Sequence, residues 1–190
     1  MLPDWDERFA GCEPEGHLLR DAFPRRWVRF HSLPDSKRYP ETPTEHAEVL
    51  RRHNAILGEL APVGSRVVLV TTGYSETPVP VRTYEGLLAL DPAAVFWRTL
   101  ARHQPDEEAT FPNWWHLFTS AHVWRPGTFD PVIRLVADGT VANVLVVAPD
   151  CRWVLHPYDG GMDVIAESAE ERGRLRATYS DWLSRHPGGL

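Results

Sequence analysis

Three short apolar runs, separated by two turn signals, make up residues 141–166, VANVLVVAPDCRWVLHPYDGGMDVIA. The first run, 141–148, is nearly all apolar, which is typical of a central strand covered on both faces. Pro149-Asp150 then turns the chain into a partner strand over 152–156. Asp159-Gly160 is a second turn signal, and it leads to a third strand over 162–166. Strands that follow one another through tight turns predict an antiparallel meander.

Two capping boxes place helices on either side of these strands. Thr42-Pro-Thr-Glu45 has proline at the first helical position and predicts a helix to about Leu60. Its apolar face carries Val49 and Ile56, and Arg52 falls on the opposite, polar face. Ser168-Ala-Glu-Glu171 starts a final helix. One face of that helix presents Leu175, Tyr179, Trp182 and Leu183.

The rest of the chain alternates between weaker helix and strand signals. Short helices are expected over 5–10, 17–23 and 130–139, strands over 27–33, 66–72, 95–100 and 115–124, and loops over 73–80 and 104–113. Strands and helices in this order predict the α+β class. We therefore expect an antiparallel β meander flanked by helices, in a single globular domain that spans residues 1–190.

Composition excludes several functional classes. The chain has 190 residues, a hydrophobic content of 43% and a net charge of −6, whereas nucleic-acid binders carry a basic balance. The acidic start, Met1 to Asp6, lacks the pattern of a signal peptide, and Val144 to Ala148 is too short to span a membrane. Cys12 and Cys151 are too few for a disulfide scaffold, although one bridge stays open. These features predict a cytoplasmic protein with no nucleic-acid or membrane partner.

No spacing in the sequence supports a metal or a cofactor. The chain has nine histidines. His46 and His53 are seven positions apart on a helix, about 10 Å along its axis, and His116 and His122 are about 20 Å apart on a strand. The sequence also lacks the glycine-rich loops that hold phosphates. We expect no metal and no cofactor.

One candidate site is the most cationic stretch of the chain. It contains the only lysine, and its members are Arg25, Arg26, Arg29, His31, Ser32, Ser36, Lys37, Arg38 and Tyr39. Guanidinium forks and an ammonium suit recognition of a carboxylate or another anion. The alternative is a solvated loop that forms structural ion pairs.

A second candidate site has the opposite charge. The segment His156-Pro-Tyr-Asp-Gly-Gly-Met-Asp163 could place Tyr158, Asp159 and Asp163 together at the end of a hairpin. The alternative is that Asp159-Gly160 forms only a turn and that Asp163 binds backbone amides. Since the two segments have opposite charges, they could also pair with each other.

The strand over 114–124 leaves an open question about a surface. Trp114, His116, Phe118, His122 and Trp124 share one face of it. If that face is exposed, it suits a protein partner, and if helices cover it, it belongs to the core.

Two segments of the chain resemble a bacterial family of unknown function. They are Arg29-Phe-His-Ser-Leu-Pro-Asp-Ser-Lys-Arg-Tyr-Pro40 and His156-Pro-Tyr-Asp-Gly-Gly-Met-Asp163 with the helix that follows it. Some members of that family have an arginine where this chain has Gly160. The resemblance implies kinship and carries over no activity.

Two hypotheses about function follow from the residues. The first is a non-enzymatic protein that binds a protein partner, of an immunity or regulatory type. The second is a small enzyme or sensor that binds a small anion through Arg29, Lys37 and Arg38, with His31, Tyr158 or Asp159 as acid or base. The second predicts that both candidate segments line one pocket.

Overall fold

A computed structural model describes residues 2–102 and 113–184, and all the structural findings below concern those residues. The helices are α1 (Trp5–Arg8), α2 (Gly16–Ala22), α3 (Pro43–Leu60), α4 (Glu85–Leu90), α5 (Asp130–Ala137) and α6 (Ala169–Thr178), with 3-10 turns η1 (Pro34–Ser36) and η2 (Ser180–Trp182). The strands are β1 (Trp27–His31), β2 (Arg66–Ser75), β3 (Val95–Arg102), β4 (Asn113–Val123), β5 (Leu145–Val147), β6 (Val154–Tyr158) and β7 (Gly161–Ile165).

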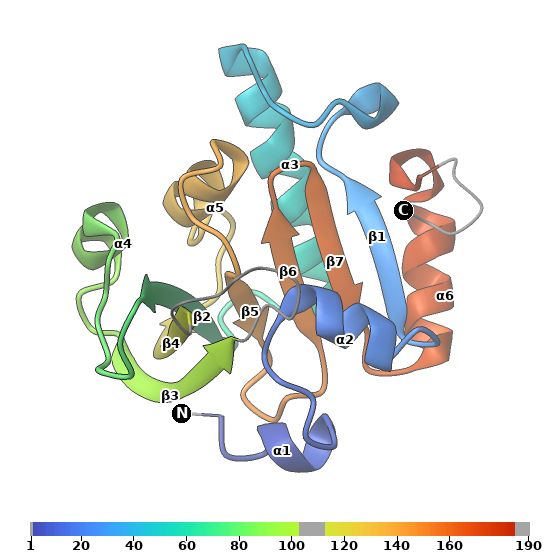
Figure 1. Cartoon of the computed structure of the whole chain (residues 1–190). Coiled ribbons are helices and arrows are strands. Elements are labelled where there is room, and N and C mark those ends of the chain that lie inside the picture. Colours follow the sequence, from blue (N-terminus) through green and yellow to red (C-terminus); the bar gives the residue numbers. More distant parts are fainter. Residues whose placement is uncertain (1, 103–112, 185–190) are drawn as a thin grey trace.

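The described strands form one antiparallel sheet of seven in the order β1-β7-β6-β5-β2-β4-β3. The predicted meander is the run β5-β6-β7, and β2 joins it to the β3-β4 pair (Figure 1). The predicted α+β class with an antiparallel sheet is therefore confirmed.

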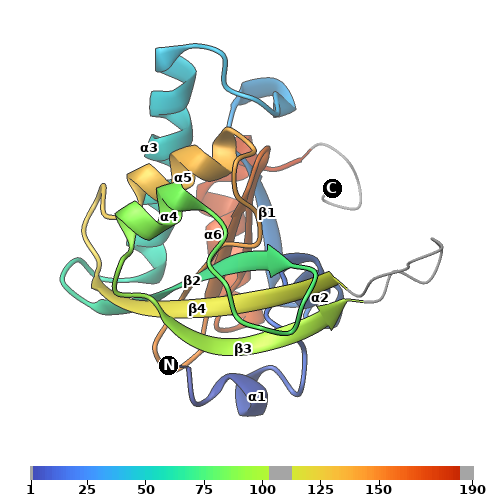
Figure 2. The same ribbon diagram turned by 60° about the vertical axis from the view of Figure 1, so that its left-hand side comes forward.

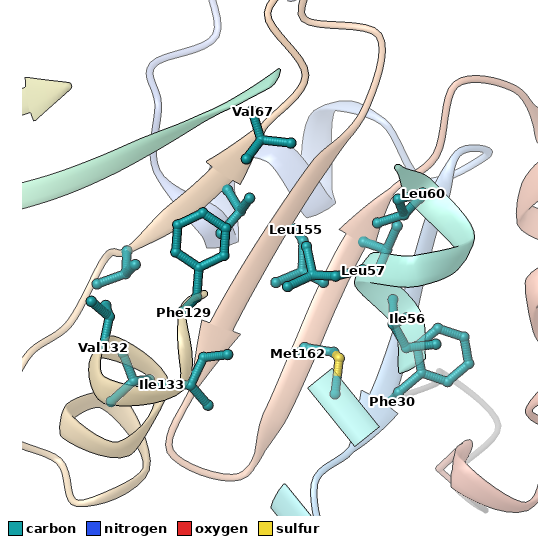
Figure 3. Close-up of a cluster of buried hydrophobic side chains, with 14 of the residues drawn as sticks. Phe30, Ile56, Leu57, Leu60, Val67, Phe129, Val132, Ile133, Leu155 and Met162 are labelled. Carbon is teal, nitrogen blue, oxygen red and sulfur yellow. The ribbon is translucent and has the colours of Figure 1, made fainter. Parts of the chain in front are cut away.

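Helices cover both faces of this sheet. Side chains of α3 and α5 bury one face, where Ile56 and Ile133 lie on either side of Leu155 (Figure 3). Leu19 of α2 and Trp5 of α1 pack on the opposite face. Figure 2 shows α4 and α5 on one side of strands β2, β4 and β3 and α1 on the other. The apolar faces of the sheet and helices are thus removed from water on both sides.

The central strand is shorter than the sequence predicts. It runs only from Leu145 to Val147, although the whole apolar run 141–148 was expected to be extended. Asn143 is in the left-handed conformation, with φ of 48°. Its buried side-chain amide accepts a bond from the backbone N–H of Gly16 and donates to the carbonyl of Pro14. These hydrogen bonds to the N-terminal segment therefore hold the backbone in a turn before the strand begins.

Other boundaries also differ from the predictions. The loop expected over 73–80 starts later, because β2 continues to Ser75, and α4 was not predicted. The loop expected over 104–113 lies almost entirely outside the described residues. The final helix ends at Thr178, so Tyr179, Trp182 and Leu183 pack against the core from beyond its end.

The aromatic face of β4 is largely core. His116, Phe118 and Trp124 are buried there. The His116 ring bridges three strands through Ser75 Oγ at 2.8 Å and Thr99 Oγ1 at 2.9 Å. The interpretation of this face as a docking surface is therefore wrong for its central residues.

The two cysteines, Cys12 and Cys151, are both free thiols.

Candidate functional site

The two segments of opposite charge lie side by side in the sheet. β1 pairs with β7, which places Arg29 opposite Asp163 and His31 opposite Gly161. β6 pairs with the other side of β7, which places Tyr158 opposite Gly161. The backbone N–H of Ser32 donates to the carbonyl of Gly160 at 3.1 Å. The loop after β1 is thus joined to the β6–β7 turn.

The inner part of this polar cluster is a buried ion pair. Arg29 Nε and Nη2 donate to the two oxygens of Asp163 at 2.7 and 2.9 Å. The guanidinium also lies over the ring of Tyr158, 4.8 Å from its centroid. Burial raises the pKa of the Tyr158 phenol, so the phenol keeps its proton at neutral pH. This bidentate pair compensates the charge of the arginine within the cluster.

The outer part of the cluster is also paired internally. Arg38 Nε and the Tyr39 hydroxyl donate to Asp159 at 3.0 and 3.1 Å. Lys37 Nζ donates to Glu45 at 2.6 Å and to Glu41 at 3.0 Å. Arg29, Lys37 and Arg38, the three cations of the anion hypothesis, are therefore already matched by carboxylates of the chain.

The single lysine has a structural partner at the start of α3. Glu45 completes the predicted capping box, because its carboxylate accepts from the Thr42 backbone and Thr42 Oγ1 accepts from the Glu45 backbone. Lys37 holds the pKa of Glu45 down at about 2. Lys37 therefore ties the loop after β1 to the first turn of α3.

Both histidines of the cluster favour the neutral form. Burial lowers the pKa of His156 to about 4, and the backbone of α2 packs so closely on its ring that a Cβ at Gly16 would overlap it. Burial and the nearby Arg29 charge lower the pKa of His31. His31 Nε2 is buried and has no hydrogen-bond partner among the described residues.

A cavity of about 350 Å³ opens beside this cluster, at the edge of the sheet. Its walls come from β1, η1, α3 and η2. The lining residues are His31, Leu33, Pro34, Asp35, Ser36, Arg52, Asp181, Trp182 and Leu183. Of the predicted site residues, His31 and Ser36 line this cavity, and Arg29, Lys37, Arg38, Tyr39, His156, Tyr158, Asp159 and Asp163 do not.

Arg52 is the charged side chain of the cavity that the sequence reasoning missed. It was placed on the polar face of α3, but it is only 5% exposed. Its Nε donates to Glu48 at 2.6 Å, its Nη1 donates to the His31 carbonyl at 3.0 Å, and its guanidinium lies 5.1 Å from the Trp182 ring centroid. Ile56 is four positions after Arg52, so the two side chains lie on the same side of α3. Ile56 is apolar and buried, and this spacing is the signal in the sequence that predicts the burial of Arg52.

The η1 wall of the cavity has an unusual backbone. Asp35 and Ser36 have φ of 55° and 59°, in the left-handed region that residues other than glycine rarely adopt. Such conformations cost of order 1–3 kcal/mol each and cluster at functional sites. The tight turn brings Pro34, Asp35 and Ser36 onto the cavity.

A shallower groove of about 470 Å³ adjoins the cavity. Leu33, Pro34 and Asp35 line both of them. The remaining groove residues are Lys37, Thr44, Glu45 and Glu48. The groove and the cavity therefore meet along the same three residues.

We expect Gly161→Ala to destabilise the fold by about 1–3 kcal/mol, because overpacking strains a dense core by this amount. A Cβ at Gly161 would overlap the Phe30 carbonyl and would lie 2.7 Å from the Tyr158 hydroxyl. Gly160→Ala is the matched control, since its Cβ would meet side-chain atoms of Arg38 at 3.2 Å and of Tyr158 at 3.4 Å, both longer contacts than those at Gly161. It should stay within about 0.5 kcal/mol of the wild type. Urea unfolding measures both, and equal losses would contradict the structure.

Comparisons with known proteins identify a family of unknown function. No curated protein and no solved structure matches the chain. Among the described residues, no helix is long and apolar enough to cross a membrane, and no three or more His, Cys, Asp or Glu side chains gather as metal ligands would. Residues 15–187 match a family model described as a domain of unknown function (DUF3885), so the chain belongs to that family, as its resemblance to a family of unknown function led us to expect.

Proposed function

We propose that the protein binds a small molecule through a carboxylate, or a similar anionic group, in the cavity between β1, η1, α3 and η2. The observation that carries this proposal is the buried Arg52 guanidinium on the cavity wall. Glu48 pairs with this guanidinium, which accounts for its burial, and the pairing leaves N–H donors of Arg52 on the cavity wall for a ligand. The sequence alone predicts an anion site at Arg29, Lys37 and Arg38. The proposed site lies instead at Arg52 on α3.

The N–H donors of Arg52 support an anionic ligand group, and His31 and Trp182 offer contacts to the rest of the ligand. The contacts of Arg52 with Glu48 and the His31 carbonyl use two of the five N–H donors of a guanidinium. Guanidinium forks match carboxylates in geometry and charge. His31 Nε2 offers a buried polar atom that a ligand could satisfy. Trp182 adds a flat apolar wall.

Binding without catalysis is part of this proposal. Two of the three groups considered as acid or base in the sequence, Asp159 and Tyr158, are engaged elsewhere, whereas His31 lines the cavity. Asp159 accepts from Arg38 and Tyr39, and the Tyr158 phenol stays protonated in its buried position. A sensor or carrier role therefore fits the arrangement better than turnover.

Titration calorimetry with 4-methylpentanoate, a small apolar carboxylate, tests the proposal. We expect the wild type to bind it and Arg52→Met to lose at least about tenfold in affinity, the loss of one charge-assisted hydrogen bond. Arg38→Met is the matched control, because the Arg38 side chain is 63% exposed and lies outside the cavity. It should bind as the wild type does.

A second variant is needed because Arg52 is buried, and loss of binding in Arg52→Met could come from misfolding. Trp182→Ala removes a half-buried wall of the cavity. It should weaken binding at a temperature at which circular dichroism shows that the variant is still folded. No binding of any small carboxylate to the wild type, or equal losses in Arg52→Met and Arg38→Met, would disprove the proposal.

A protein partner is a second candidate, favoured by the open edge of the sheet. Among the described residues, β3 pairs only with β4, whereas Leu183 forms a bridge to Phe30 at the β1 edge. Val95 and Phe96 of β3 are 57% and 47% exposed. An open edge strand accepts an extended segment of another chain. An immunity or regulatory role would use such an interface.

Charged substitutions on β3 test this second candidate. We would purify the protein from its native host and compare it with the double variant Val95→Lys, Phe96→Lys. A stoichiometric partner that is lost in this variant and retained in Lys37→Ala, Arg38→Ala would support docking at β3. Loss in the loop variant alone would place the interface at residues 37–38.

A single domain, a bacterial origin and a cytoplasmic location remain part of the proposal.

A further inference from the structure

We infer that the ligand of the cavity is a zwitterion with an apolar side chain, namely an apolar α-amino acid. This inference rests on the proposed function and names the ligand class of the same site. It rests on two observations. The cavity carries charges of both signs, and a groove adjoins it.

The charges on the cavity have both signs. Arg52 supplies a buried guanidinium, and Asp35 and Asp181 supply carboxylates on the η1 and η2 walls. A simple anion would gain from Arg52 but would meet like charges at the two aspartates. An α-amino acid carries an ammonium beside its carboxylate, so that both charges of the ligand find opposite partners in a cavity of about 350 Å³.

The adjoining groove supplies a place for a side chain. It shares Leu33, Pro34 and Asp35 with the cavity, so a ligand anchored at Arg52 can extend over Pro34 without leaving the surface. The charged groups of the groove are paired: Lys37 with Glu45, and Glu48 with Arg51 and Arg52. What the groove offers a ligand is therefore the exposed pyrrolidine ring of Pro34 and the aliphatic parts of its neighbours.

Four compounds separate the contributions of the ammonium, the carboxylate and the side chain. Leucine has all three, 4-methylpentanoate lacks the ammonium, 3-methylbutylamine lacks the carboxylate, and glycine lacks the side chain. By titration calorimetry at pH 7, we expect leucine to bind most tightly and each removal to weaken binding by about tenfold or more.

Charge-neutral variants of the two aspartates provide the matching protein control. Asp35→Asn, Asp181→Asn removes both charges at exposed positions, and asparagine tolerates the left-handed backbone of residue 35. We expect this variant to bind 4-methylpentanoate at least as well as the wild type does. Its preference for leucine over that acid should disappear.

The outcomes separate this inference from the proposed function. If 4-methylpentanoate binds the wild type as tightly as leucine does, the zwitterion is wrong and the carboxylate site stands. If glycine binds as tightly as leucine, the groove does not hold a side chain and the inference is overturned. If neither leucine nor 4-methylpentanoate binds, or if 3-methylbutylamine alone binds, the proposed function fails as well.

Discussion

Asp163→Ala should destabilise the protein by about 3–5 kcal/mol, because removing one partner of a buried ion pair leaves the other charge buried and uncompensated. The Arg29 and Asp163 side chains are 17% and 4% exposed. Arg29 makes both of its bonds to this carboxylate in a bidentate geometry. Urea unfolding at pH 7 would show the loss as a lower midpoint with an unchanged slope.

Two further variants show that the loss comes from the uncompensated charge. The double variant Arg29→Met, Asp163→Leu removes both charges and should recover most of the stability, since apolar replacement of a buried pair is often neutral. Asp159→Ala breaks the pair with the largely exposed Arg38 and should cost less than about 1 kcal/mol. A double variant that is no more stable than Asp163→Ala would contradict this explanation.

Local signals in the sequence predicted the α-helices other than α4 and most strands of the fold. The capping box at Thr42 has both of its bonds, and the helix it starts ends at Leu60 as predicted. At Ser168 only one half forms, because the Glu171 carboxylate accepts from the backbone of Glu167 instead. The box still marks the start of α6. Its end was predicted poorly, because Tyr179 to Leu183 continue an apolar pattern while the helix stops.

Contacts between distant residues could not be predicted in the same way. Arg29 and Asp163 are 134 positions apart, and only the β1–β7 register brings them together. The charge of each segment can be read from its residues, but their pairing is only one of several alternatives that the residues allow. Arg52 was missed because its burial depends on η2, which packs its Trp182 over the guanidinium from far along the chain.

Phe30 also packs against residues that are distant in the sequence, so a substitution there should have a large effect on stability. Phe30 is fully buried on β1, and its ring lies 6.0 Å from that of Tyr179. Its backbone pairs with Leu183, which lines the candidate cavity. Phe30 therefore joins the core to the segment that forms the cavity wall.

We expect Phe30→Ala to destabilise the protein by about 3–5 kcal/mol, through lost burial and the void left behind. Phe96→Ala removes the same atoms from a side chain that is 47% exposed, and it should cost about 1 kcal/mol or less. Urea unfolding compares the two, and equal losses would mean that β1 is not packed as described. Because Leu183 rests on Phe30, the first variant should also weaken binding of 4-methylpentanoate under native conditions, whereas Phe96→Ala, far along the sheet on β3, should leave that binding unchanged.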